Sequence, residues 1–224
     1  LVERCELRED VAKAITLKKG FAEADCEIAY CKAHGIEAVG CDQEHYPRLL
    51  REIEDFPTAI YVRGDVGALS RRTVAFVGTR KVSSYGQRMC DKLVQELHEL
   101  LPDVVIVSGL AYGVDGESHR AALAYGATTV GVVANTLPNV TPATHSRLAA
   151  DMVANGGAIV TELNSQTKQN GRFYIPRNRI IAALSAGTVV VESAESGGSL
   201  STAAFADGYN RSVMAVPGRA VDAN

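Results

Sequence analysis

The chain has 224 residues, 46% hydrophobic and 22% charged, which suits one sizeable α/β domain with a smaller appendage. Its formal net charge of −3 gives no electrostatic argument for a nucleic-acid partner, although a local basic pocket is compatible with it. No apolar run is long enough to span a bilayer and no signal peptide is visible, so we expect no membrane partner and a cytoplasmic location. Residue 1 is Leu rather than Met, and we therefore expect a fragment.

The five cysteines favour reduced thiols, because they are odd in number and show no CxxC spacing. Four of them lie in the first 41 residues, where His34 or His45 could complete a zinc site. The spacing matches no usual zinc finger, so we expect no bound metal.

Residues 1–45 are charged and read as a small helical region that glycines break into short pieces. Tyr46-Pro47 and Phe56-Pro57 then mark turns before a short predicted strand at 59–62. We accordingly predict a helical N-terminal region over 1–45 and an α/β domain over 46–224.

From Thr73 onward, apolar runs alternate with amphipathic stretches. Strands are predicted at 74–77, 104–107, 128–133, 158–163, 188–191 and 212–216. Helices are predicted between them, over a stretch that carries Met89 to Leu101 and ends at Pro102, and at 117–125, 146–154, 177–185 and 200–209. Continuous apolar strands of this kind indicate a mostly parallel sheet covered by helices on both faces.

Three predicted strands end in turns rich in small residues: Gly78-Thr79-Arg80-Lys81, Ser108 to Asp115, and Ser196 to Thr202. Each turn offers backbone N–H groups and hydroxyls to an anion. Ligands of parallel sheets collect at this carboxyl edge, so the three turns together indicate a phosphate-bearing ligand. The alternative for Arg80 and Lys81 is a solvated surface pair.

Several familiar sites are missing. The first strand is not followed by GxGxxG, and the second does not end in an acidic residue for a ribose, so we expect no dinucleotide cofactor. Neither a P-loop nor a GxSxG elbow is present. Asp115 and His119 could form a base–carboxylate pair on one helix face, but we favour Asp115 as a helix cap. Glu162 is either a general base or an acceptor for backbone N–H groups.

Residues 172–179 bring three arginines, an asparagine, Phe173 and Tyr174 to one loop–helix junction. Arginines at a helix N-terminus oppose the macrodipole, so another demand should place them there. Guanidinium groups grip phosphate bidentately, and aromatic faces stack on bases, as a single-stranded nucleic-acid site requires. Alternatively, Arg177 and Arg179 pair with carboxylates while the aromatics fill core.

At these residues the chain resembles a family, the DNA-processing protein A family (DprA, also called Smf) of bacterial natural transformation. The matching stretches follow the family's order from about Tyr46 to Gly218: 77–81, 108–116, 119–122, 155–157, 177–182, 189–192, 196–203 and 215–218. The resemblance implies an extended Rossmann-like domain that binds single-stranded DNA, shields it and helps to load the RecA recombinase, usually as a homodimer. It implies no catalysis, so we expect no enzyme.

Carried over by position, the resemblance assigns a phosphate pocket to Arg80, Ser108, Gly109, Arg177 and Arg179, with Lys81 beside it. Its far side would be closed by Gly197, Gly198 and Ser199. Phe173 or Tyr174 would contact bases, because Tyr174-Ile175-Pro176 stands where the family has Phe-Pro-x. We expect three acidic residues to support the pocket: Asp115, Glu162 and Glu192. A C-terminal winged helix, common in the family, is not expected in this chain.

Two other functions remain open. The first is a nucleoside-monophosphate phosphoribohydrolase of the lysine-decarboxylase-like type, acting through Glu162 or Glu192, although its Pro-Gly-Gly-x-Gly-Thr turn is missing. The second is a sensor of free nucleotide.

Overall fold

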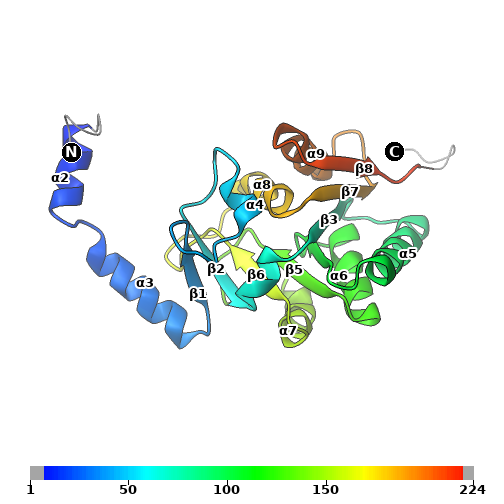
Figure 1. The fold of residues 1–224 in the computed structure, drawn as a ribbon, viewed down its shortest axis with the longest axis horizontal. Helices are drawn as coiled ribbons and strands as arrows, with labels where there is room; N and C mark the ends of the chain where they lie inside the picture. The colour runs from blue at the N-terminus through cyan, green and yellow to red at the C-terminus, as the bar shows by residue number, and fades with distance from the viewer. Residues whose placement is uncertain (1–7, 219–224) are drawn as a thin grey trace.

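An eight-stranded sheet organises the computed structural model, which describes residues 8–218. The strand order is β1-β2-β6-β5-β4-β3-β7-β8 (Figure 1). The strands are β1 (Glu37–Gly40), β2 (Ala59–Gly64), β3 (Thr73–Gly78), β4 (Val105–Ser108), β5 (Thr128–Val132), β6 (Ala158–Thr161), β7 (Gly187–Glu192) and β8 (Ser212–Ala215).

The six strands from β6 to β8 are parallel, while β2 joins β6 and β1 joins β2 in antiparallel pairs. From β3 the chain first adds β4, β5 and β6 on one side and then returns to place β7 on the other. The order of the strands therefore reverses at β3, and open parallel sheets form their ligand crevice at such a point. This confirms the predicted mostly parallel α/β fold.

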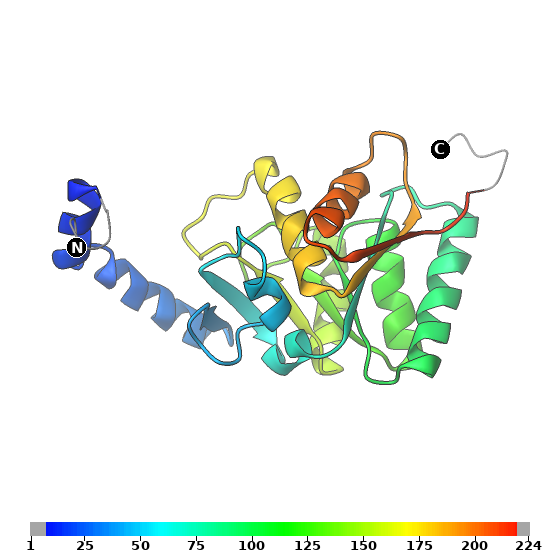
Figure 2. The ribbon, with the colours of Figure 1, turned by 45° about the horizontal axis from the view of Figure 1, so that its top comes forward.

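Helices cover both faces of the sheet (Figures 1 and 2). One face carries α5 (Ser84–Leu100), α6 (Val114–Tyr125) and α7 (Ser146–Ala154), and the other carries α4 (Arg48–Arg51), α8 (Tyr174–Leu184) and α9 (Gly198–Gly208). Three 3-10 turns, η1 (Val66–Ser70), η2 (Ala143–His145) and η3 (Gly171–Phe173), join these elements.

Side chains of β3 alternate between the two faces, as the pleat requires. Phe76 belongs to the apolar cluster that contains the buried side chains of α5 and α6, whereas Ala75 and Val77 belong to the cluster that contains those of α8. Both faces of this strand are therefore core, which explains its continuous apolar sequence.

Several elements differ from the sequence prediction, among them β1 and α8. β1 is an edge strand within the stretch 1–45 that the pattern predicted to be helical. α8 begins at Tyr174 rather than Arg177, because the helix tolerates Pro176 in its first turn. The N–H that proline lacks would have no hydrogen-bond partner within the helix at that position.

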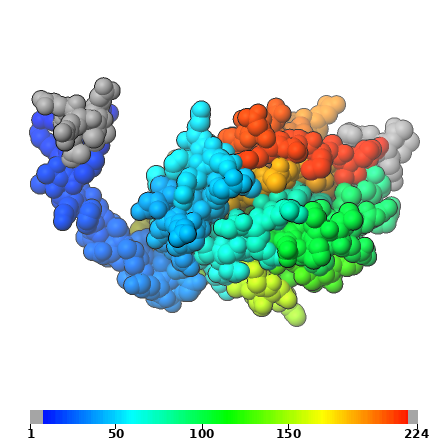
Figure 3. All heavy atoms as spheres, viewed as in Figure 1, coloured from blue at the N-terminus to red at the C-terminus, as the bar shows by residue number. Residues whose placement is uncertain are grey.

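The N-terminal helices α2 (Glu9–Thr16) and α3 (Phe21–Ala33) extend from the body of the molecule as an arm (Figures 1 and 3). The end of α3 is held to the body by the Tyr30 hydroxyl, which donates to the Leu137 carbonyl oxygen at 3.2 Å, and by Glu27, which accepts from Ser165. Within residues 8–218, no helix is long and apolar enough to cross a bilayer, and no three metal-ligating side chains come together. Cys5 and the rest of residues 1–7 lie outside the described part.

Candidate functional site

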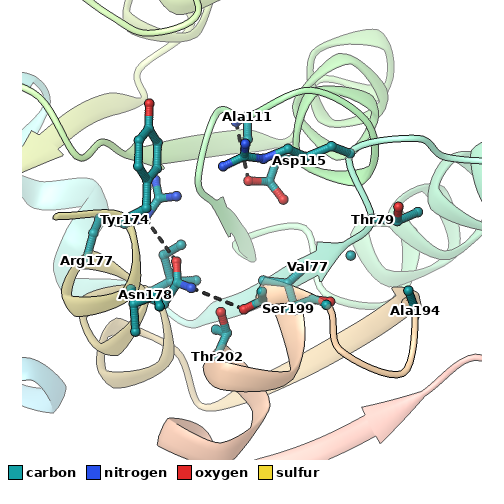
Figure 4. Close-up of a pocket in the computed structure, with 16 residues that line it drawn as sticks. Val77, Thr79, Ala111, Asp115, Tyr174, Arg177, Asn178, Ala194, Ser199 and Thr202 are labelled. Carbon is teal, nitrogen blue, oxygen red and sulfur yellow. Dashed lines mark hydrogen bonds between the residues drawn. The ribbon is translucent and has the colours of Figure 1, made fainter. Parts of the chain in front are cut away.

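A cleft of about 270 Å³ opens at the carboxyl ends of β3, β4 and β7, where the strand order reverses (Figure 4). Its walls come from the turns after these three strands and from the first turns of α8 and α9. The lining residues are Val77, Gly78, Thr79, Arg80, Ala111, Asp115, Tyr174, Ile175, Arg177, Asn178, Ile181, Ala194, Gly197, Gly198, Ser199 and Thr202.

Arg177 anchors α8 to the sheet. Its side chain is buried, its Nη1 donates to the carbonyl oxygens of Gly109 (2.7 Å) and Val132, and its Nε donates to Asn178 Oδ1 at 3.2 Å. Burial lowers the pKa of this guanidinium, and the charge of Asp115 opposes that effect. Much of its donor capacity is thus used within the protein, where it joins α8 to the ends of β4 and β5.

Asp115 occupies the turn that the sequence pattern assigned to an anion. Its Oδ2 accepts from the Ala111 N–H at 3.3 Å, and the backbone of Gly109 also favours its charged form. Burial raises the pKa of Asp115, while Arg177 and these backbone groups act against the rise. Ser108 is fully buried and its hydroxyl donates to the Phe76 carbonyl oxygen at 2.6 Å. Ser108 and Gly109 therefore lie behind the cleft lining, not on it.

Arg80 is the exposed cation of the cleft. Its guanidinium carbon lies 5.3 Å from the centre of the Tyr174 ring, and both residues line the cavity. Among residues 8–218, no carboxylate forms an ion pair with Arg80. Lys81 and Phe173 lie outside the lining, and the Phe173 ring has the guanidinium of Arg172 5.0 Å from its centre.

The N-terminus of α9 faces the cleft with Gly197, Gly198 and Ser199. Within the described part of the chain no side chain caps this helix, so its free backbone N–H groups and the positive end of its dipole are directed at the cavity. Asn178, to which the sequence pattern gave no role, joins α8 to this end of α9 through Gly198 O (3.2 Å) and Ser201 Oγ (3.0 Å). In the sequence, the position of Asn178 directly after Arg177 is the signal that could have identified it as a site residue.

The remaining predicted residues take part in contacts away from the cleft lining. Arg179 pairs with Glu162 at 2.7 Å and with Asp55 at 3.2 Å. The carboxylate of Glu192 accepts from both the backbone N–H and the hydroxyl of Ser83, at 3.0 Å each, next to the start of α5.

Asp115 and His119 are bonded separately. His119 is fully buried, and its Nδ1 lies 2.7 Å from Thr129 Oγ1, whose proton is donated to the Ile106 carbonyl oxygen. Nδ1 is therefore the protonated nitrogen of a neutral ring. Burial lowers the pKa of His119 to about 3, so the ring stays uncharged at neutral pH.

The sequence profile of one family, described as DNA recombination-mediator protein A, matches residues 37–224. The chain belongs to this family. The match confirms the resemblance seen in the motifs. It begins at Glu37, the first residue of β1, so it takes in the whole sheet.

Named relatives of the DNA recombination-mediator protein A family agree with this assignment. Protein Smf of Escherichia coli is 38% identical over 205 residues, which are 90% of this chain and 52% of that protein. DNA processing protein DprA of Bacillus subtilis is 36% identical over 196 residues, which are 87% of this chain and 65% of that protein. The chain thus spans between about half and two thirds of these relatives.

Two solved structures share the family fold. DNA processing protein A from Streptococcus pneumoniae superposes with a TM-score of 0.77 at 32% identity, covering 87% of this chain and 68% of that one. The protein from Helicobacter pylori, reported with its single-stranded DNA binding mode, gives a TM-score of 0.74 at 26% identity and covers 84% of both chains.

Proposed function

We propose that this chain binds single-stranded DNA at the carboxyl edge of its sheet, protects the incoming strand and helps to load a RecA-type recombinase onto it during natural transformation. The observation that carries the proposal is Arg80, an exposed cation held over Tyr174 that lines the same cleft as the N-terminus of α9. The homodimer that the family resemblance implies and the cytoplasmic location expected from the sequence belong to the same proposal.

Each part of the cleft has a task in this proposal. A backbone phosphate enters between Arg80 and the N–H groups of Gly198 and Ser199, which supply a charge-assisted donor and an oriented dipole. The base beside that phosphate stacks on Tyr174, whose ring borders the same cavity. Stacking on a side chain requires an unpaired base, so the site favours single strands over duplexes.

Binding without bond cleavage fits the positions of the acidic groups. A phosphoribohydrolase would need Glu162 or Glu192 beside a bound ribose phosphate. Neither carboxylate lines the cleft: Glu162 is paired with Arg179, and Glu192 is bonded to Ser83. Asp115, the carboxylate that does line it, is bonded within its own turn.

The proposal is tested by fluorescence anisotropy with labelled oligo-dT over a salt series. We expect Arg80→Ala to weaken binding roughly 10- to 100-fold, the range for removing a hydrogen bond to a charged group. The negative slope of log affinity against log salt should also become shallower, by about 0.7 for each phosphate that the variant no longer neutralises.

The matched control is Arg72→Ala. Arg72 is also exposed and immediately precedes β3, so it stands at the opposite end of the strand that Arg80 follows. Its variant should bind like the parent. Equal binding by Arg80→Ala and the parent would refute the proposal, as would a preference for duplex DNA. If AMP displaced the oligonucleotide and bound with the same affinity, the result would indicate a nucleotide sensor instead.

A further inference from the structure

The turn between β4 and α6 is held in a strained conformation. Leu110, which is fully buried, has a φ of +55°, and Gly113 has a φ of +75°. A left-handed non-glycine residue is sterically strained and persists only where its surroundings fix it. Here His145 Nδ1 donates to the Leu110 carbonyl oxygen at 2.9 Å, and Arg177 bonds to Gly109.

Tyr112 lies between these two left-handed residues and is directed outward. Its hydroxyl lies 3.0 Å from Thr144 Oγ1, and its ring meets the His145 ring edge-on, with 5.3 Å between the centres. Half of the side chain nevertheless remains exposed to solvent. A tyrosine fixed in this way has little conformational freedom left to lose when a flat ligand stacks on it.

The sheet order places Tyr112 beside the phosphate cleft. It directly follows Ala111, which lines the cavity, and its partner Thr144 lies in η2 after β5. Since β4 lies between β3 and β5, a DNA strand held at Arg80 and continuing toward β5 would cross the β4–α6 turn, which carries Tyr112. The carboxyl edge of the sheet is its upper side in Figure 2, where α5, α8 and α9 begin.

We propose that Tyr112 is a second base-stacking residue, which receives the nucleobase on the β5 side of the phosphate cleft. This inference rests on the proposed function, because it extends the same single-stranded DNA track by one position. Tyr174 on α8 then lines the cleft, Tyr112 on the β4–α6 turn follows the lining residue Ala111, and Arg80 serves the phosphate.

The chain contains no tryptophan, so Tyr112→Trp introduces a unique fluorescent reporter. We expect oligo-dT to quench it, with the same midpoint that anisotropy gives for binding. The control is Tyr125→Trp, at the other end of α6, where the hydroxyl bonds to Asp91; its emission should not change. Oligo-dT that binds by anisotropy and leaves the emission at position 112 unchanged would overturn the inference.

Tyr112→Ala and Tyr112→Phe separate stacking from bracing of the turn. With a long oligo-dT, the affinity of Tyr112→Ala should be about 5- to 100-fold weaker, the range for removing one base stack. Tyr112→Phe keeps the ring and removes only the hydroxyl that bonds to Thr144, and it should bind like the parent. Equal weakening in both variants would assign Tyr112 to bracing and overturn the stacking role.

The same titrations distinguish this inference from the proposed function. A parent protein that bound no oligo-dT would refute the proposed function, and the inference with it. A parent that bound normally, together with an unaffected Tyr112→Ala, would overturn the stacking role alone. If Tyr112→Ala failed to fold by circular dichroism, the Trp and Phe variants would still decide the question.

Discussion

Three arginines that the sequence places near one pocket have different surroundings in the fold. Arg177 is buried and bonded to backbone carbonyl groups, and Arg179 is paired with two carboxylates, whereas Arg80 lies against the Tyr174 ring. A ligand phosphate would have to compete with Asp55 and Glu162 for Arg179. We therefore expect Arg80 to contribute more to anion binding than either of the others.

The buried ring of His119 should make stability depend on pH. Folding lowers its pKa from 6.5 to about 3, so the unfolded chain takes up a proton on this residue below pH 6.5 while the folded protein does not. The stability contribution is fully present above pH 6.5 and is lost as pH falls toward 3, by up to about 1.4 kcal/mol per pH unit.

Urea unfolding of the parent and of His119→Asn between pH 7 and pH 4 measures this effect. Asn retains a donor near the Nδ1 position for Thr129, so the variant should fold but lack the His119 part of the slope. Asp115, whose raised pKa acts in the opposite direction, is common to both proteins and cancels in the difference. Parallel stability curves for the two proteins would show that His119 does not titrate in this way.

The residue types at the site could be predicted, but their bonding partners could not. Sequence alone marked Arg80 and the glycines at the start of α9, because small and cationic residues follow apolar runs there, and Tyr174, because it lies within a cluster of arginines. It gave no sign that Ser108 bonds to Phe76 or that Arg179 meets Asp55, since these partners lie far away in the chain. A side chain that is available to a ligand and one that is bonded within the protein cannot be distinguished from the sequence.

At the level of elements, the β4–α6 turn contains a glycine, Gly113, at which any side chain would clash with the backbone. Gly113 has φ +75° and ψ −132°, and a Cβ there would overlap the carbonyl oxygen of Thr79. Gly126, at the other end of α6, also has a positive φ of 79°, but a Cβ would find open space. The two ends of one helix therefore provide a matched pair of substitutions.

We expect Gly113→Ala to lower the free energy of unfolding by about 3 kcal/mol or more, because it adds a backbone clash to conformational strain. Gly126→Ala should lower it by only about 1 kcal/mol, which is the strain of a left-handed alanine. Chemical denaturation of both variants gives the comparison. Similar values for the two variants would mean that the Thr79 backbone moves aside readily.

Most elements could be predicted from apolar periodicity, because each central strand is buried on both faces and each covering helix on one. β1 escaped prediction because it is a four-residue edge strand, Glu37–Gly40, with only Val39 fully buried. Its pairing with β2 depends on a strand that comes later in the chain. Short edge strands of this kind carry little periodic signal.

At the level of the whole molecule, the N-terminal arm and the sheet contribute unequally to stability. The side-chain ion pairs at α2, Arg8–Asp10 and Lys13–Glu9, are local and largely exposed. Exposed pairs of this kind stabilise a protein by less than about 1 kcal/mol. The apolar clusters that contain the sheet, in contrast, draw on elements from α3 to α9.

Deleting residues 1–19 should accordingly change the free energy of unfolding of the remaining chain by less than about 1 kcal/mol. Urea titration followed by circular dichroism measures this, and oligo-dT anisotropy should give the parent affinity in the same preparation. A deletion that unfolded the sheet, or that reduced DNA binding, would show that residues 1–19 act beyond α2.

The hydrogen bonds around the cleft determine which partner loses freedom on binding. Arg177 joins α8 to β4 and β5, and Asn178 joins α8 to α9, so the walls are cross-linked before any ligand arrives. A receptor prepared in this way has little entropy to lose, and most of the ordering cost falls on the flexible nucleic acid. Stiff or structured strands should then differ in affinity from flexible ones, even when they present identical phosphates.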